Sequence, residues 1–396
     1  MRRTGEVSDG DRRALVGTRH RLAPPARAAG AVEVAAALVG LHATDAASVY
    51  LSVAARSRHP ELAAVDTALY DDRTLVRVLG MRRTMFVVPA ELAPVVHGAC
   101  TVAIAARERR HLVRQLEQAG AGADCGRLLR QAEAETLAVL AERGSATAAE
   151  LSAAVPTLRR TFSFGEGTRW AGTQGLSTRV LFLLSADGHI VRGRPRGSWV
   201  STAYRWSPTE AWLGRPLTGL APADARAELA RRWLASYGPA AAADLKWWAG
   251  WTVAEARAAL AAAGAVEVDL APGPGVAAAG EEHPAAPPAS EPWAALLPSL
   301  DPTVMGWHER DWYLGSHRPL LFDRSGNAGP TVWWDGRVVG GWAQRAGGEV
   351  RVRLLHDVGA DGRAAVAAEA DRLQRLLGHR RVTPRFRTPL ERELSA

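Results

Sequence analysis

Residues 40–52 read GLHATDAASVYLS, and this stretch places three polar side chains between two apolar segments. His42, Thr44 and Asp45 follow an alanine-rich segment, 31–39, that we predict to be helical. On an extended backbone, residues two positions apart point to the same side. The spacing therefore predicts that His42 and Thr44 present an imidazole and a hydroxyl to one cavity, as a pair able to hold a water molecule.

The composition indicates a soluble protein with basic character. The chain has 396 residues, enough for two to four compact units, and its hydrophobic fraction of 47% can fill real cores. The net charge is +8, and Lys246 is the only lysine among 49 cationic side chains. The planar arginine fork suits phosphate and guanine. A GC-rich genome produces the same preference for arginine over lysine, and we attribute most of this preference to it.

Cysteines and apolar runs exclude several protein classes. Cys100 and Cys125 are the only cysteines, and their spacing fits neither a zinc site nor a disulfide framework. No uncharged apolar run reaches 18 residues, and no apolar signal core follows the N-terminal Met-Arg-Arg. We therefore expect a cytoplasmic protein without a membrane span.

Three successive regions repeat the order of helices, a turn and a short β-rich segment. We place them at residues 1–98, 99–215 and 216–270, and the second contains a capping box at Thr147 and Glu150. This order is typical of winged helix-turn-helix units. The helices expected in them cover residues 9–20, 31–40, 61–70, 99–119, 127–143, 175–185, 223–237, 240–249 and 252–263, and the β-rich segments include 74–88 and 266–270.

The last third of the chain has a different texture. Residues 271–292 are rich in Pro, Ala and Gly, which predicts a flexible linker. Residues 293–396 are dense in Trp and β-branched residues at first, and Asp335-Gly336 between two apolar segments is a strong hairpin signal. We expect a small antiparallel sheet or barrel here, followed by a helix over 362–377.

Short motifs recur in a fixed order along the chain: GLHATD at 40–45 with LS at 51–52, RTLVR at 73–77, MRRT at 81–84, YGP at 237–239, LLPSLDP at 296–302 and GPTVWWDGRVVG at 329–340. In this order and spacing they make the chain resemble the AlkZ-like (YcaQ-related) DNA glycosylases over essentially its whole length. The resemblance implies an α+β fold in which three tandem winged helix-turn-helix units curve around DNA, with a small C-terminal β-barrel. It also implies a monomer that excises N7-alkylated purines from double-stranded DNA with no metal or other cofactor.

The polar slots of the family's catalytic motif have changed in this chain. The family usually has Gln, an apolar residue, then Gln or Asp, and the matching positions here are His42 and Thr44. N7-alkylguanine is already a cationic leaving group, so catalysis chiefly needs a positioned water. A neutral His42 with a pKa near the operating pH could accept a proton from that water, and Thr44 could hold it.

Each motif residue also has a structural interpretation. Asp45 could orient His42 or stabilise a sugar cation, or it could cap a helix that starts near Ala46. His42 could be an incidental polar residue at a helix C-terminus. Thr44 could be an ordinary loop residue.

Candidate DNA contacts are cationic or aromatic residues near the predicted wings and the barrel. Arginines in wings can contact phosphates, and glycosylases often wedge or flip a base out of the stack. The competing interpretations are solvated surface loops for the wing arginines, core packing for at least one of Trp247 and Trp248 beside Lys246, and a barrel hairpin with ordinary surface charges at residues 307–311. The candidates are Arg82, Arg83, Arg192, Arg194, Arg196, Lys246, Trp307 and Arg310.

The sequence therefore predicts a monofunctional DNA glycosylase that acts on N7-alkylguanine. Because Thr44 is smaller than the usual Gln, a bulky natural-product adduct is favoured, with roles in base excision repair and antibiotic self-resistance. One alternative is a non-catalytic winged-helix regulator, and a weaker one is a protein that binds or hydrolyses the drug itself. His308, His317 and His356 lack metal-ligand spacing, so no metal is expected.

Overall fold

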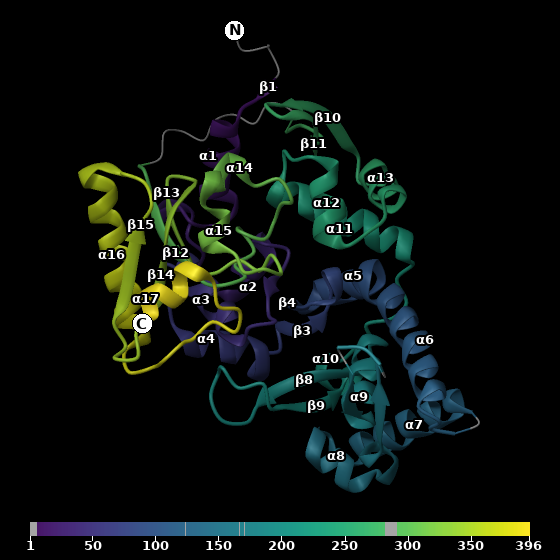
Figure 1. Ribbon diagram of the computed structural model, residues 1–396. Coiled ribbons are helices and arrows are strands. Elements are labelled where there is room, and N and C mark those ends of the chain that lie inside the picture. The colour runs from purple at the N-terminus through teal and green to yellow at the C-terminus, as the bar shows by residue number, and fades with distance from the viewer. Residues whose placement is uncertain (1–5, 123, 166, 170, 282–290) are drawn as a thin grey trace.

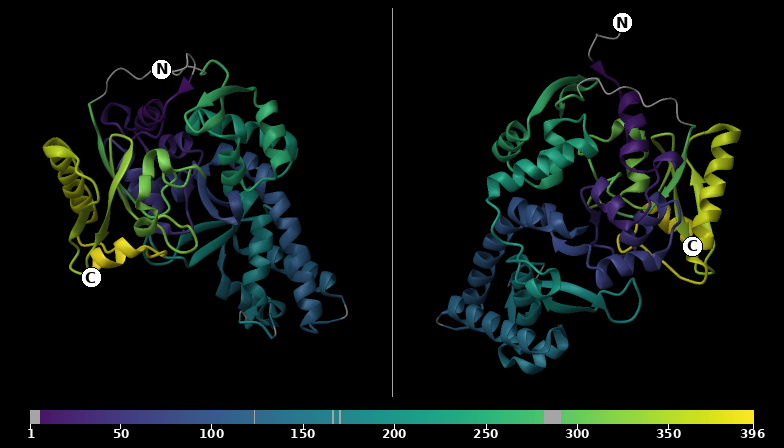
Figure 2. Two further views of the ribbon diagram at one scale, coloured as in Figure 1. Left: turned by 45° about the horizontal axis from the view of Figure 1, so that its top comes forward. Right: turned by 180° about the vertical axis from the view of Figure 1, so that it is seen from behind.

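Five small sheets with helices packed around them form the described part of the chain, which comprises residues 6–122, 124–165, 167–169, 171–281 and 291–396 of the computed structural model. Figures 1 and 2 show a larger body and a smaller one that hangs below it and contains α6 to α9. The apolar cores follow this division. One cluster includes Trp233, Trp307 and Trp333 and joins the first, third and C-terminal regions, whereas Leu140 and Leu184 belong to a separate cluster of the second region.

The first region confirms the predicted helices and the β-rich end. Ser8 begins the first helix with a reciprocal capping box to Asp11, which satisfies backbone donors that a helix start leaves open. The strands form an antiparallel sheet in the order β2-β4-β3, with His42 opposite Phe86. The elements are α1 (Asp9–Arg19), α2 (Ala31–Ala37), β2 (Leu41–His42), α3 (Ala46–Arg56), α4 (Leu62–Asp66), β3 (Leu75–Leu79), β4 (Met85–Pro89) and α5 (Ala93–Val96), with short turns η1 (Pro24–Ala26), η2 (Thr67–Asp71), η3 (Met81–Arg83), η4 (Ala90–Leu92) and η5 (His97–Thr101).

The second region also has the expected order, and the Thr147–Glu150 capping box is present. The candidate contacts Arg192 and Arg194 lie on a strand, because β8 runs through Arg192 to Pro195 with an irregular register there. The sheet order is β5-β9-β8, and a separate hairpin, β6-β7, was not predicted. The elements are α6 (Val102–Gln118), α7 (Cys125–Arg143), β5 (Ala146–Thr147), α8 (Ala148–Ala154), η6 (Pro156–Arg159), β6 (Thr161–Phe164), β7 (Gly172–Gly175), α9 (Leu176–Ala186), β8 (Ile190–Pro195), β9 (Tyr204–Pro208) and α10 (Thr209–Leu213).

The third region extends further than expected. Residues 273–278, predicted as part of a flexible linker, form strand β11, which pairs antiparallel with β10 along its whole length. The Gly and Pro content of this segment predicted a linker, but Val276 and Ala277 can pack beneath the hairpin. The prediction from composition was therefore wrong for these residues. Residues 282–290 of the predicted linker lie outside the described residues. The elements are α11 (Pro222–Tyr237), α12 (Ala242–Ala249), α13 (Val253–Ala262), β10 (Ala265–Leu270) and β11 (Gly273–Ala278), with β1 (Glu6–Val7) parallel to β10.

The C-terminal region contains an open antiparallel sheet in the order β12-β13-β14-β15, so the predicted barrel does not close among the described residues. Helix α16 covers one face of this sheet, and its Val366 packs against the apolar side chains of that face. In a closed barrel, other strands would have to cover these side chains. The Asp335-Gly336 hairpin and the late helix are confirmed. The elements are β12 (Ala294–Leu297), α14 (Asp311–Leu314), η7 (Gly315–His317), α15 (Arg318–Leu321), β13 (Thr331–Trp334), β14 (Arg337–Gln344), β15 (Val350–Leu354), α16 (Gly359–Leu377) and α17 (Pro389–Ser395).

Each of the three N-terminal regions thus places helices before a small sheet that ends in a β-hairpin. This agrees with the order expected of winged helices, and their assignment as three such units stays a prediction. Across the same described stretches, no helix is both long enough and apolar enough to cross a membrane.

Candidate functional site

Helix α3 begins directly after the His-Ala-Thr motif, and Asp45 caps its start. One carboxylate oxygen of Asp45 accepts a hydrogen bond from the backbone N–H of Ala47 at 3.1 Å, and the other accepts from the backbone N–H of Arg385 at 2.9 Å. Burial raises the pKa of Asp45, and these two hydrogen bonds oppose that rise. The helix-cap interpretation of Asp45 is confirmed, and the second bond ties the motif to the C-terminal segment.

A buried ion pair fixes α3 against the loop after β12. The Arg56 guanidinium donates to both carboxylate oxygens of Asp301, at 2.6 and 2.8 Å, and both side chains are fully buried. Ser52 Oγ donates to the same carboxylate at 2.7 Å. Burial would raise the pKa of Asp301, but the neighbouring Arg56 charge and these hydrogen bonds outweigh it and hold the pKa below its ordinary value. The LLPSLDP motif therefore positions the helix that follows the His-Ala-Thr motif.

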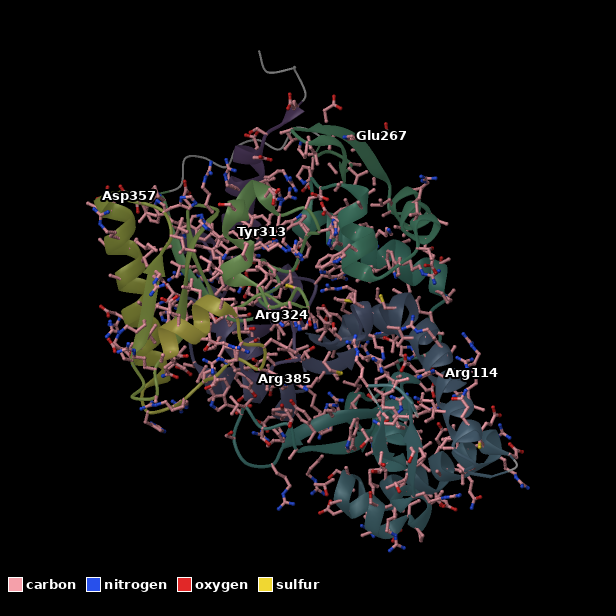
Figure 3. The ribbon with its side chains drawn as sticks, in the orientation of Figure 1. Arg114, Glu267, Tyr313, Arg324, Asp357 and Arg385 are labelled. Atoms are coloured by element: carbon pink, nitrogen blue, oxygen red, sulfur yellow. The ribbon has the colours of Figure 1, made fainter. Side chains whose placement is uncertain are left out.

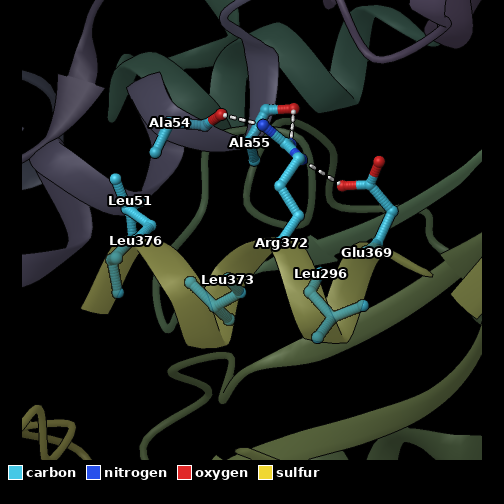
Figure 4. A pocket seen from close by; sticks show the side chains of 8 residues that line it. All are labelled: Leu51, Ala54, Ala55, Leu296, Glu369, Arg372, Leu373 and Leu376. Atoms are coloured by element: carbon cyan, nitrogen blue, oxygen red, sulfur yellow. Dashed lines mark hydrogen bonds and ion pairs between the residues drawn. The ribbon is translucent and has the colours of Figure 1, made fainter. Parts of the chain in front are cut away.

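The C-terminal end of α3 is held from the other side by α16. Arg372 donates to the backbone carbonyls of Ala54 and Ala55, at 3.1 and 3.3 Å, and to the carboxylate of Glu369 at 2.9 Å (Figure 4). A cation is favourable at a helix C-terminus. The cavity beside this contact has a volume of only about 20 Å³, which leaves room for about one water molecule rather than a ligand.

His42 is buried on β2 and uncharged. Its ring lies 5.1 Å from that of Phe86, and its Nδ1 has no hydrogen-bond partner in the described ranges. Burial, together with the nearby Arg82 charge, lowers the pKa of His42 to about 3. The prediction of a pKa near the operating pH was therefore wrong, because the side chain is removed from water beside a cation. His42 is therefore a neutral imidazole in this structure.

Thr44 lies on the wall of a large cleft, which we call the motif cleft. The cleft has a volume of about 730 Å³ and runs between the first region, the second region and the C-terminal segment. The Oγ1 atom of Thr44 is buried, and the structure gives it no partner among the residues it describes. His42 does not line this cleft. Strand β2 ends at His42 and the chain then bends into α3, so the alternation that would have put both side chains in one cavity is lost.

The motif cleft is cationic. Arg192, Arg196 and Arg385 line it, and no carboxylate belongs to its described lining. Burial, and secondarily the Arg77 charge, lowers the pKa of Arg192 to about 10, so this guanidinium is still protonated at neutral pH. None of these three arginines forms an ion pair with a carboxylate in the described ranges, and such a group around one cleft suits a phosphate backbone.

Two of the predicted DNA contacts are already paired with carboxylates. Arg83 forms an ion pair with Glu108 at 2.8 Å, and Arg194 forms one with Asp71 at 2.7 Å. Neither lines the motif cleft. Both charges are therefore partly neutralised, and their role as phosphate contacts stays a prediction.

The structure contradicts the predicted wedge at Trp307 and Arg310. Trp307 is only 2% exposed, donates from its indole N–H to the Tyr237 carbonyl at 3.0 Å, and packs in an aromatic core cluster. Arg310 is 4% exposed, and the residues after it form a short helix rather than a strand. Neither side chain can reach a base stack, because both are buried. Burying the large apolar indole of Trp307 in a Trp-rich core is more favourable than exposing it at the surface.

Arg82 and Arg310 instead flank the same indole. Their guanidinium carbons lie 4.0 and 4.6 Å from the Trp247 ring centroid. Arg82 is half-buried, and its backbone adopts a left-handed conformation (φ 53°) that non-glycine residues rarely take. Lys246, the residue before this indole, is exposed on α12, and its role as a DNA contact stays a prediction.

Sequence reasoning missed Arg385. This arginine is 341 residues from Thr44 in the chain, yet its guanidinium donates to the Thr44 carbonyl at 3.3 Å. Its only sequence signal is its place in the arginine-rich segment 385–392, which carried no motif.

Comparison with known proteins places this chain in a family. The family described as DNA glycosylase AlkZ-like matches residues 35–376. The chain therefore belongs to the AlkZ-like DNA glycosylases, which confirms the resemblance drawn from its motifs and identifies it as a glycosylase acting on DNA.

A solved structure supports the fold. The structure of the Streptomyces sahachiroi DNA glycosylase AlkZ is similar to this chain with a TM-score of 0.73 and 21% sequence identity. The similarity covers 95% of this chain and 98% of that one, so the mixed α+β architecture is shared along almost the whole length. A search of curated protein sequences finds no match.

Proposed function

We propose that this enzyme is a monofunctional glycosylase that hydrolyses the N-glycosidic bond of N7-alkylated guanine in double-stranded DNA. The observation that carries the proposal is the pair of buried, unpartnered atoms in the motif, Thr44 Oγ1 and His42 Nδ1. A buried polar atom without a partner is costly, and such atoms in an enzyme often await substrate or water. Thr44 is itself one of the residues that line the cationic motif cleft.

The chemistry needs little acid or base assistance. In the reaction the C1′–N9 bond breaks, its electron pair neutralises the positive charge of the alkylated base, and a water oxygen bonds to C1′. The water then loses a proton to solvent. Thr44 positions the water, and neutral His42 acts as a second hydrogen-bonding group that holds the motif's geometry. With its pKa lowered to about 3, His42 is too weak a base to take the proton outright.

The size of the motif cleft favours a bulky adduct. A volume of about 730 Å³ is typical of sites for drug-sized ligands and far exceeds what a methyl group needs. Thr44 is also smaller than the Gln usual in the related motif. A bulky natural-product adduct on guanine, removed as the first step of base excision repair by a monomeric cytoplasmic enzyme, fits these features, and self-resistance to a DNA-alkylating antibiotic is the corresponding biological role.

One observation favours the alternative of a regulator that binds DNA without excising a base. His42 is buried against Phe86 and does not line the motif cleft. A protein that had lost catalysis could keep the cationic cleft for DNA binding, while position 42 became part of the hydrophobic core.

The test is base release from duplexes that carry either N7-methylguanine or a bulky N7-alkylguanine. The proposal predicts release of the modified base and alkali-sensitive abasic sites, with faster release of the bulky adduct. Faster release of methylguanine would overturn the assignment of a bulky substrate. Tight binding of both duplexes with no base release would establish the regulator instead.

A further inference from the structure

A second cleft lies beside the motif cleft, and we call it the C-terminal arginine cleft. It has a volume of about 1010 Å³ and lies between the α15 end, the loop after it and the segment that leads into α17. Phe322 and Asp323 belong to its lining, together with five arginines: Arg318, Arg324, Arg385, Arg387 and Arg392.

Most of this positive charge is not neutralised. Asp323 is occupied by its own loop, since its carboxylate accepts hydrogen bonds from Ser325 N at 2.8 Å and from Asn327 N at 2.9 Å. Arg387 pairs with Glu391. The other four arginines of the cleft have no carboxylate within ion-pair distance in the portion of the chain that the structure describes.

Arg385 belongs to both clefts, so the two cationic surfaces are continuous. In Figure 3 the labelled Arg324 and Arg385 lie close together near the centre of the view, whereas Arg114 lies away from them on α6. The surface therefore leads from Thr44, past Arg385, onto the C-terminal region.

A buried aromatic ring in the lining of the cleft packs against two arginine side chains. Phe322 is 5% exposed, and the guanidinium carbons of Arg318 and Arg310 lie 5.6 and 5.2 Å from its ring centroid. Packing of Arg318 on this fixed ring reduces the conformational freedom that it would lose on meeting an anion.

We propose that the C-terminal arginine cleft binds the phosphodiester backbone of the substrate duplex beyond the lesion. This inference rests on the proposed function, because it takes the damaged duplex to occupy the motif cleft. Arginine forks match phosphate oxygens, and a row of them spread along an open cleft suits a repeating anion. The C-terminal region then binds DNA directly rather than only buttressing α3.

The experiment measures the affinity of undamaged duplex DNA as a function of salt. Each phosphate contact contributes roughly 0.9 to the negative slope of log K against log salt concentration. The triple variant Arg318→Gln/Arg324→Gln/Arg392→Gln should reduce that slope by up to about 2.7. Substitution of the same three residues with Lys keeps the charges and should restore most of the slope.

A matched control removes the same net charge elsewhere. Arg107, Arg110 and Arg114 are exposed on α6, and none lines either cleft. Their triple Gln variant should keep the wild-type slope. If the cleft variant loses no more slope than this control, or if Lys does not restore it, the proposal is overturned.

Base release by the wild type, measured alongside, separates the two proposals. If the wild type binds DNA with the predicted slope change in the cleft variant but releases no base, the proposed glycosylase specificity fails and the phosphate cleft stands. If the wild type releases base and the cleft variant has an unchanged slope, the cleft proposal fails alone.

Discussion

The ion pair between Arg56 and Asp301 offers the sharpest quantitative prediction, because it fixes the helix that follows the His-Ala-Thr motif. Both side chains are fully buried and joined by two hydrogen bonds. In Asp301→Leu the Arg56 guanidinium keeps its bonds to the His20 and Ser52 carbonyls but loses its counter-charge. An uncompensated buried charge costs about 3–5 kcal/mol, a large share of the 5–15 kcal/mol by which domains are stable.

The assay is urea unfolding of four proteins: the wild type, Arg56→Met, Asp301→Leu and the double variant Arg56→Met/Asp301→Leu. We expect each single variant to lose about 3–5 kcal/mol in the free energy of unfolding and the double variant to lose less than either, since it leaves no lone charge. If the single losses stay below about 1 kcal/mol, or if they add in the double variant, the pair does not hold α3 as described.

The same pair has a pH signature. In the wild type the pKa of Asp301 is lowered, so its stabilising effect is present above the unfolded pKa and is lost as pH falls through the folded pKa. In Arg56→Met the guanidinium that opposes the effect of burial is gone. Burial should then raise the pKa of Asp301 above its value in the unfolded chain. The destabilisation by Arg56→Met should therefore be smaller at pH 5 than at pH 8, in contrast to that of Asp301→Leu.

Three further predictions follow from the site. Trp307→Ala should cost about 3–5 kcal/mol in urea unfolding because it empties a core position, and the folded fraction should bind DNA like the wild type; selective loss of DNA affinity would restore the wedge interpretation. Arg385→Gln should weaken duplex binding and reduce its salt slope by about 0.9 with an unchanged Tm, because this exposed side chain lines both clefts. Because burial beside Arg82 lowers the pKa of His42 to about 3, the excision rate should show no inflection from His42 between pH 5 and 8; an inflection near pH 6.5 that His42→Gln removes would contradict this.

Local signals in the sequence predicted much of the secondary structure. The capping box at Thr147 and the Asp335-Gly336 turn lie where the sequence placed them, because each depends on a few neighbouring residues. The segment 273–278 was misjudged for the converse reason. Its Gly and Pro content is typical of a linker, and only pairing with β10 makes it a strand.

The site depends on contacts between distant parts of the chain, which local patterns do not encode. Arg385 reaches Thr44, and Asp301 reaches Arg56, across more than 200 residues of sequence. Trp307 was misassigned to the surface because an aromatic residue next to charged neighbours fits either a wedge or a core. The burial that makes His42 neutral likewise arises from tertiary packing against Phe86 and Arg82.

The central claim is that Thr44, held in place by the neutral His42, positions the hydrolytic water at the motif cleft, and single-turnover excision of a bulky N7-alkylguanine tests it most directly. The account predicts that Thr44→Val and His42→Ala each slow base release by about 100-fold, the loss expected when a reacting group is misplaced by about 1 Å. Thr202→Val, which changes another threonine of the same cleft outside the motif, should leave the rate within a few-fold of the wild type. Equal rates for the wild type and both motif variants would contradict the claim.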